Sequence, residues 1–218
     1  DAVEYLKKSL AFFQTDTSAA AKEYSEAIKK NFKYLSSTFF NDAGALLDPD
    51  HYSLAIENYE KFKEWILIAE PTYNIKVREI EFKNALATVY DQIFLSNFKI
   101  NAMFYGMTED LNKQVIALDT NNWSGNYNLA MLNYNYGVNI VNDMSANMET
   151  ILVIAIDEIL EQAREKFKKA LPYALKAYAL NPKRKEVLQA LDGIYTALYE
   201  EQKAEEFKAK VELLNKDK

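Results

Sequence analysis

The stretch Ala170-Leu-Pro-Tyr-Ala-Leu-Lys-Ala177 decides the fold, because its spacing of small residues returns elsewhere in the chain. A small side chain lets two helix backbones approach, and a larger one a turn later fills the space beyond. Ala20-x3-Tyr24-x2-Ala27 returns 35 residues later as Ala55-x3-Tyr59-x2-Phe62. The first position of the Ala170 stretch returns 34 residues later at Ala204. A period of 34 or 35 residues is typical of stacked helical hairpins.

Capping and breaking residues divide the chain into ten predicted helices. Thr15-Asp-Thr-Ser18 supplies an N-cap, and Asp48-Pro49 and Glu70-Pro71 each separate two helices. The pattern then stays helical from about 73 to 104, until Gly106, and Thr108 caps the next helix. We therefore predict an all-α protein with a single domain, residues 1–218, made of five antiparallel hairpins. They span about 2–34, 36–70, 73–118, 123–180 and 183–215.

Several of these residues resemble the tetratricopeptide repeat (TPR). The best-matching stretches are Phe39 to Phe62 and Ala170 to Ala204, the second including Pro182. The residues from Phe167 to Pro182 are similar to repeat proteins that Bacteroidetes export. The resemblance implies a right-handed α-α superhelix, or solenoid, with a concave groove lined by the inner helix of each hairpin.

The period breaks in the middle of the chain. Trp123 and Lys185 occupy equivalent repeat positions but lie 62 residues apart, 28 more than one 34-residue unit. Shared between two antiparallel helices, the excess predicts a central hairpin longer by roughly 20 Å. The apolar run Ile151–Ile156 falls in this extension and needs a covering surface. We expect the helix at 73–104 to cover it, the alternative being another chain in a homodimer through residues 145–160.

The composition excludes several classes of protein. With 5 Gly and 4 Pro in 218 residues, the chain lacks the turn residues of a sandwich or barrel. A net charge of −6 argues against binding of nucleic acid. The longest uncharged apolar run, Ile151–Ile156, is too short for a transmembrane helix.

No familiar catalytic, metal or cofactor motif is present in the sequence. Cysteine is absent, and the single His51 follows Asp48-Pro-Asp50, where an exposed histidine in a capping turn is expected. No glycine-rich phosphate-binding loop occurs. Acidic clusters such as Glu200-Glu201 alternate with lysine, as on a solvated helix surface. We therefore expect no enzyme activity, no metal and no cofactor.

The candidate binding residues are those that the resemblance places along the groove. The helix at 122–142 is also rich in asparagine and tyrosine, which suits hydrogen bonding to an extended peptide or a glycan. Alternatively, its tyrosines and Met131 are core residues between helices. The candidates are Phe40, Asn41, Tyr127, Asn128, Met131, Tyr134, Asn135 and Gln189.

Two functions remain. The first is a non-catalytic scaffold that binds a protein or peptide through the groove or the elongated hairpin. The second, which rests on family analogy alone, is a cell-envelope accessory protein for glycan handling or outer-membrane assembly. The resemblance favours an exported or periplasmic protein, with a cytoplasmic one as the alternative. The start at Asp1 fits either a removed signal peptide or another trimming.

Overall fold

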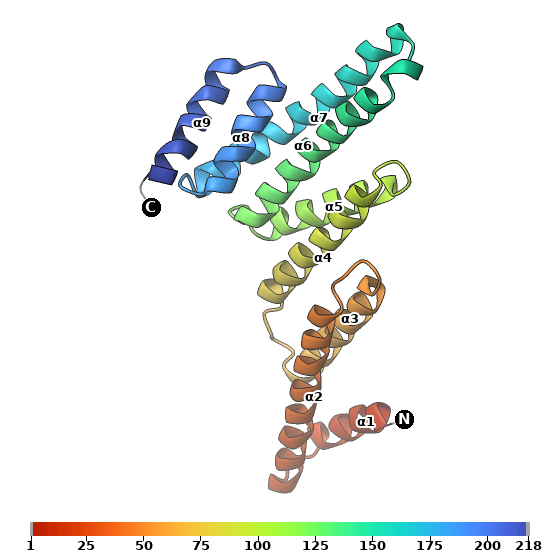
Figure 1. The fold of residues 1–218 in the computed structure, drawn as a ribbon. Helices are drawn as coiled ribbons and strands as arrows, with labels where there is room; N and C mark the ends of the chain where they lie inside the picture. The colour runs from red at the N-terminus through yellow and green to blue at the C-terminus, as the bar shows by residue number, and fades with distance from the viewer. Residues whose placement is uncertain (1, 217–218) are drawn as a thin grey trace. The chain divides into compact units, whose positions relative to one another are not determined.

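The computed structural model describes residues 2–216, apart from the side chains of residues 2, 3, 14, 150 and 154. Residues 1, 217 and 218 of the predicted domain therefore lie outside the described residues. Within residues 2–216 the fold is all-α, without a strand (Figure 1). The helices are α1 (Ala2–Thr15), α2 (Ala19–Ala45), α3 (Tyr52–Ala69), α4 (Lys76–Ser96), α5 (Ala102–Leu118), α6 (Trp123–Ala146), the 3-10 helix η1 (Met148–Thr150), α7 (Val153–Leu180), α8 (Lys185–Ala197) and α9 (Glu201–Lys216).

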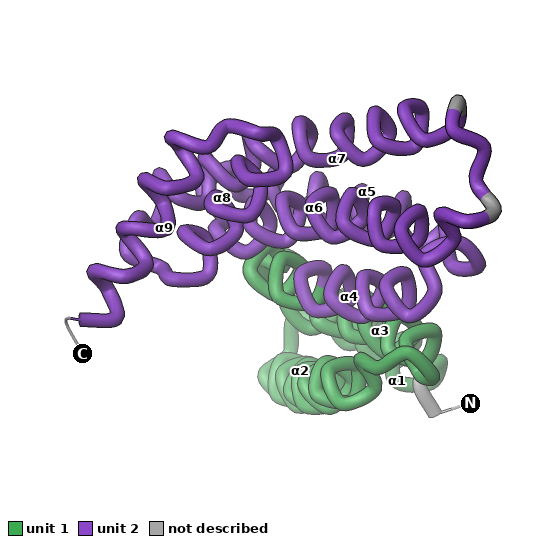
Figure 2. The backbone as a smooth tube through the Cα atoms, turned by 45° about the horizontal axis from the view of Figure 1, so that its top comes forward, with its two compact units in different colours: residues 1–82 green, residues 83–218 purple. Residues whose placement is uncertain are grey.

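The chain forms two compact units, residues 1–82 and 83–218 (Figure 2). The first contains α1 to α3 and the start of α4. The second contains the rest of α4 and α5 to α9. Each unit has its own hydrophobic clusters.

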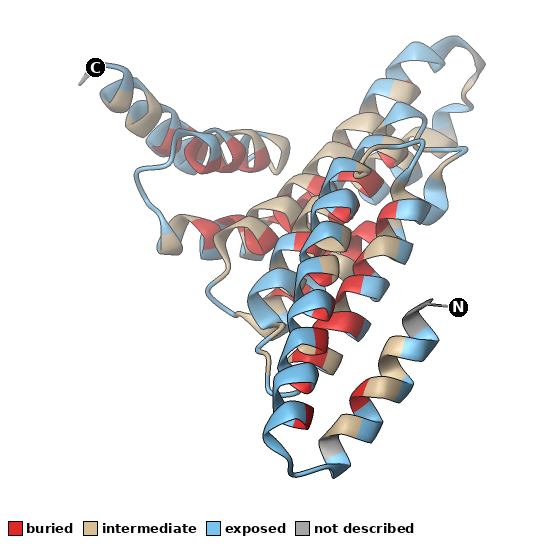
Figure 3. Cartoon of the chain, turned by 90° about the horizontal axis from the view of Figure 1, so that it is seen from below, coloured by how far each residue is buried: buried red, intermediate tan, exposed pale blue. Residues whose placement is uncertain are grey.

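Trp65 of α3 is the centre of one core cluster in unit 1. The rings of Phe32 and Phe39, both on α2, meet it edge-on at centroid distances of 5.7 and 4.9 Å. Leu10 of α1 and Ile28 of α2 are buried in the same cluster. Figure 3 shows that buried residues occupy one side of these helices, as expected when an amphipathic helix packs through a single face.

The predicted Ser18 cap of α2 is confirmed, whereas Asp48 and Pro49 lie in the turn before α3 and the N-cap residue of α3 is His51. Ser18 Oγ accepts a hydrogen bond from the Ala21 N–H at 3.2 Å and so begins α2. Asp48 accepts bonds from the backbone N–H groups of Asp50 and His51 in the turn before α3. His51 is exposed in this turn, and the hydrogen bond from its ring to Asp48 raises the pKa of the imidazole.

The close contact between α6 and α7 organises unit 2. These helices lie side by side along their length (Figures 1 and 2), with Gly137 of α6 against Phe167 of α7. A Cβ atom at Gly137 would lie 2.5 Å from Phe167 Cε1, so only glycine fits this approach without a shift. A second hairpin, α8 with α9, buries Leu191 and Ile194 against Phe207.

One predicted helix break is wrong because α2 is continuous. We expected two helices to meet near residue 35, but α2 runs for 27 residues from Ala19 to Ala45. No proline or capping turn interrupts this stretch. The chain between residues 2 and 216 therefore has nine α-helices and one 3-10 helix instead of ten long helices.

A second predicted boundary is also wrong. The helix expected at 73–104 ends at Ser96, so Gly106 and Thr108 lie inside α5 instead of between two helices. Asparagine side chains explain the earlier end. Asn101 Nδ2 donates to the carbonyl of Ile93 at 2.8 Å and to Ser96 Oγ at 3.1 Å, which satisfies groups at the end of α4.

The first copy of the repeat is out of register. Ala20, Tyr24 and Ala27 are exposed, and the buried face of α2 begins one residue later, at Ala21 and Ser25. The alanine run 19–21 allows either register, so composition alone did not distinguish them. The other copies are buried as predicted, namely Ala55, Tyr59, Phe62, Ala170, Ala174, Ala177 and Ala204.

The apolar run Ile151–Ile156 is not covered as expected. Leu152 is 75% exposed and Val153 is 82% exposed, and the side chain of Ile154 lies outside the described residues. Because α4 ends at Ser96, it is shorter than the helix that we expected to cover this run. The central hairpin is nevertheless long, with 24 residues in α6 and 28 in α7, against 13 and 16 in α8 and α9. A homodimer through residues 145–160 stays a prediction.

Candidate functional site

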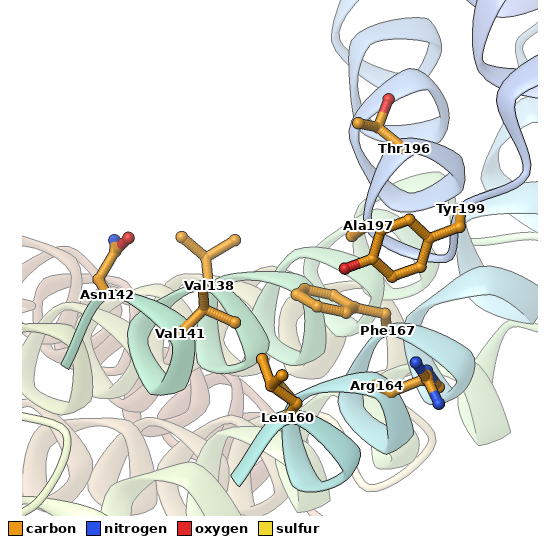
Figure 4. Close-up of a pocket in the computed structure, with 10 residues that line it drawn as sticks. Val138, Val141, Asn142, Leu160, Arg164, Phe167, Thr196, Ala197 and Tyr199 are labelled. Carbon is orange, nitrogen blue, oxygen red and sulfur yellow. The ribbon is translucent and has the colours of Figure 1, made fainter. Parts of the chain in front are cut away.

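An apolar cavity of about 280 Å³ lies between α6, α7 and the end of α8 (Figure 4). Its volume is near the lower end of ligand pockets and suits an amino-acid side chain. Figure 4 shows Leu160 and Phe167 projecting from α7. Arg164 provides a charge at the cavity and pairs with Glu161 at 2.8 Å. The lining residues are Val138, Val141, Asn142, Leu160, Ala163, Arg164, Phe167, Thr196, Ala197 and Tyr199.

Tyr199 has the most unusual backbone in this cavity. Its φ is 61°, the only positive value at a non-glycine residue in the described chain. The Tyr199 N–H donates to the Thr196 carbonyl, and the Glu200 N–H donates to the Tyr195 carbonyl. These two bonds define a Schellman motif, in which glycine normally occupies the left-handed position. A tyrosine there is strained, yet its side chain is 76% exposed and recovers little by burial.

The asparagines of α6 that are fully buried have structural partners. Asn133 Nδ2 donates to the Leu129 carbonyl at 2.8 Å, and Asn133 Oδ1 accepts from Tyr105 Oη at 2.8 Å. Asn126 Nδ2 donates to the Asn122 carbonyl at 2.9 Å. Asn133 and Asn126 are 0% and 3% exposed, so neither presents its amide to a ligand.

The two tyrosines predicted for the groove take part in packing. Tyr127 stacks on Trp123 at a centroid distance of 4.6 Å, and the Arg184 guanidinium lies 3.8 Å from the Trp123 ring. Tyr134 lies against Gly193 of α8. A Cβ atom added at Gly193 would be 2.6 Å from the hydroxyl oxygen of Tyr134. Burial raises the pKa of both tyrosines, and the charges of Glu186 and Asp192 add to this. Both rings thus take part in packing and are half-buried.

The remaining candidates do not form one site. Phe40 and Asn41 belong to unit 1, where the Arg78 guanidinium lies 4.7 Å from the Phe40 ring. Gln189 is exposed on α8 and lines a polar depression with Lys183, Arg184, Lys185 and Glu186. Asn128 and Met131 line a second small cavity, and Asn135 is half-buried on α6.

Sequence reasoning missed the residues that line the apolar cavity. None of Val138, Val141, Leu160 and Tyr199 was a candidate, and Phe167 was named only as the start of a repeat-like stretch. One available signal was Tyr199 itself, which stands between the last two helices where glycine is the usual residue.

Comparison of the chain with protein-family models, with curated proteins and with solved structures gave no match. The geometry of the chain therefore carries the functional argument. Among the described helices, none is long and apolar enough to cross a bilayer.

Proposed function

We propose that the chain is a non-catalytic scaffold that binds a protein or peptide, with an apolar side chain of the partner in the cavity between α6, α7 and α8. The observation that carries this proposal is the position of Tyr199. A left-handed backbone costs an L-residue roughly 1–2 kcal/mol. Because the Tyr199 side chain is mostly exposed, this cost is not offset by burial in the free protein. The cost is accounted for if the Tyr199 ring forms an aromatic wall against which the partner packs.

The other walls of the cavity suit the same occupant. Val138, Val141 and Leu160 offer apolar contacts, and Asn142 and Arg164 add polar groups that can bind a peptide backbone or carboxylate. Complete burial of a leucine or phenylalanine side chain is worth about 1.5–3 kcal/mol. One anchor of this size changes a dissociation constant by roughly 10- to 100-fold.

We further propose a TPR-like superhelix as the frame that presents this site. Support comes from the buried alanines at repeat positions, including Ala55, Ala174 and Ala204. The α8–α9 hairpin, which follows Pro182, adds to it. In such a frame the elongated α6–α7 hairpin projects beyond the repeat and forms one wall of the cavity.

The test is selection of a displayed library of short random peptides on the protein, followed by fluorescence anisotropy with the selected peptides. Tyr199→Gly is the decisive variant, because glycine fits the left-handed position and loss of binding cannot be attributed to unfolding. We expect at least tenfold weaker binding. The matched control is Tyr34→Ala, which removes a tyrosine that is 72% exposed on α2.

The proposal fails if Tyr199→Gly binds the selected peptides as tightly as the unmodified chain, or if Tyr34→Ala weakens binding equally. Selection of no peptide, together with binding to a glycan array, would instead favour the envelope accessory function.

A further inference from the structure

A second cavity, of about 70 Å³, lies between α4, α5 and α6 in unit 2. Each helix contributes residues spaced by one turn, so that three helix faces converge on one point. The volume is close to that of two water molecules, so the cavity suits one small polar group. The lining residues are Ala87, Thr88 and Asp91 from α4, Thr108 and Asn112 from α5, and Asn128 and Met131 from α6.

Three wall residues already donate hydrogen bonds inside the protein. Thr88 Oγ1 donates to the Asn84 carbonyl at 3.1 Å, and Thr108 Oγ1 donates to the Phe104 carbonyl at 2.8 Å. Asn112 Nδ2 donates to the Thr108 carbonyl at 2.9 Å, which fixes the orientation of its amide. Thr88 and Thr108 therefore have only oxygen lone pairs left to offer a ligand, whereas Asn112 has its Oδ1 and the second N–H of its amide.

Two residues that line this cavity each carry a buried oxygen without a partner. Asp91 Oδ1 and Asn112 Oδ1 are buried and accept no hydrogen bond from any described residue. Asn112 is 0% exposed, so bulk water does not reach it. A buried acceptor without a donor costs about 1–3 kcal/mol, which a donating ligand would recover.

Asp91 is the one ionisable group among the seven residues that line the cavity. Burial raises the pKa of its carboxyl group to about 6. The faces of α5 and α6 that line the cavity contribute Thr108, Asn112, Asn128 and Met131, all uncharged. At neutral pH the cavity thus holds a carboxylate without a neighbouring cation on its walls.

We propose that this cavity binds a primary ammonium group, which donates hydrogen bonds to Asp91 and Asn112. An ammonium carries three donors and no acceptor, which suits the unpartnered oxygens of Asp91 and Asn112. Ala87 and Met131 provide apolar surface for an attached methylene chain, which points to the ammonium of a lysine side chain. Only the assignment of that lysine to a bound polypeptide rests on the proposed function.

The test is an NMR titration of the full chain with methylammonium chloride, followed through the side-chain amide signals of Asn112. Tetramethylammonium chloride at equal ionic strength is the probe control, since it carries the charge without an N–H donor. Asp91→Asn is the decisive variant, and Asp110→Asn, an exposed carboxylate on α5, matches its change in charge. A parallel titration with N-acetyl-lysine methylamide distinguishes a lysine side chain from a free small amine.

We expect saturable shifts of the Asn112 signals with methylammonium and none with tetramethylammonium. Asp91→Asn should weaken binding at least tenfold, and Asp110→Asn should leave it unchanged. Since Asp91 is protonated below its pKa of about 6, affinity should fall roughly tenfold from pH 7 to pH 5.

Equal response to both probes, no saturable shift, or unchanged binding in Asp91→Asn would overturn the ammonium site. Binding of methylammonium without binding of N-acetyl-lysine methylamide would support the site and overturn its assignment to lysine. None of these readouts involves Tyr199, so failure of the peptide-binding proposal leaves this result unaffected.

Discussion

Replacement of Gly137 by alanine tests the close approach of α6 and α7. The new Cβ would lie 2.5, 2.8 and 2.9 Å from three atoms of the Phe167 ring. Carbon atoms pack at about 3.5–4.0 Å, so the ring must retreat by about 1 Å. Phe167 is 6% exposed and lies 5.7 Å from the Tyr134 ring, so a shift of the Phe167 ring disturbs the packing around it.

Two opposing effects set the magnitude. Overpacking of a core costs about 1–3 kcal/mol. Alanine regains about 1 kcal/mol of helix propensity relative to glycine. We therefore expect Gly137→Ala to lower the free energy of unfolding by about 1 kcal/mol. Gly106→Ala is the matched control, because no atom lies within 4 Å of its added Cβ, and it should raise stability by about 0.5–1 kcal/mol.

Urea unfolding followed by tryptophan fluorescence measures this difference. Trp65 belongs to unit 1 and Trp123 to unit 2, so a Trp65→Phe background lets Trp123 report on the unit that contains both glycines. A Gly137→Ala variant as stable as Gly106→Ala would refute the packing of α6 on α7 described above.

Three further substitutions have predicted effects on stability, each measured by urea unfolding. Because burial raises the Asp91 pKa from 3.8 to about 6, the folded chain binds more protons between these values, and its stability falls as pH rises through 6. Asp91→Asn should thus raise the free energy of unfolding by about 3 kcal/mol at pH 7 and by little at pH 3. An equal rise at both pH values would contradict this. Tyr199→Gly should stabilise the chain by about 1 kcal/mol, and a loss would show that the tyrosine packs more than its exposure indicates. Asn133→Ala should cost about 2 kcal/mol because it removes two hydrogen bonds and leaves the Tyr105 O–H without its acceptor, and a neutral effect would argue against these bonds.

Helical periodicity predicted the parts of the fold that depend on apolar burial. Ala55, Tyr59 and Phe62 recur at a helical spacing, and all three are buried in one face of α3. Ser18 and Pro71 mark helix ends through short-range effects, which act in the same way in any context. These features therefore needed no tertiary information.

Other boundaries depended on specific side-chain contacts. The end of α4 is set by polar contacts of Asn101 with Ile93 and Ser96, which helix propensity does not reveal. The register of α2 places Ser25 in the core, whereas apolarity favoured Tyr24. Both errors arose where a polar side chain took a role that hydrophobic patterning assigns to another residue.

The candidate cavities could not be predicted because each assembles residues from three helices. Leu160 and Tyr199 are 39 positions apart in sequence but line one cavity. Asp91, Asn112 and Asn128 likewise meet only after α4, α5 and α6 pack. Asn128 and Met131 were predicted to line a groove, and they line the cavity between α4, α5 and α6. The chemistry of that cavity depends on Asp91, which was not predicted.

The central claim is that the cavity beside Tyr199 receives an apolar side chain of a partner. Methyl NMR of the chain with a selected peptide tests it most directly, through the methyl signals of Val138, Val141 and Leu160. These signals should shift on peptide addition, whereas the signal of Val77, which is 61% exposed on α4, should not. Shifts confined to residues outside the cavity would contradict it.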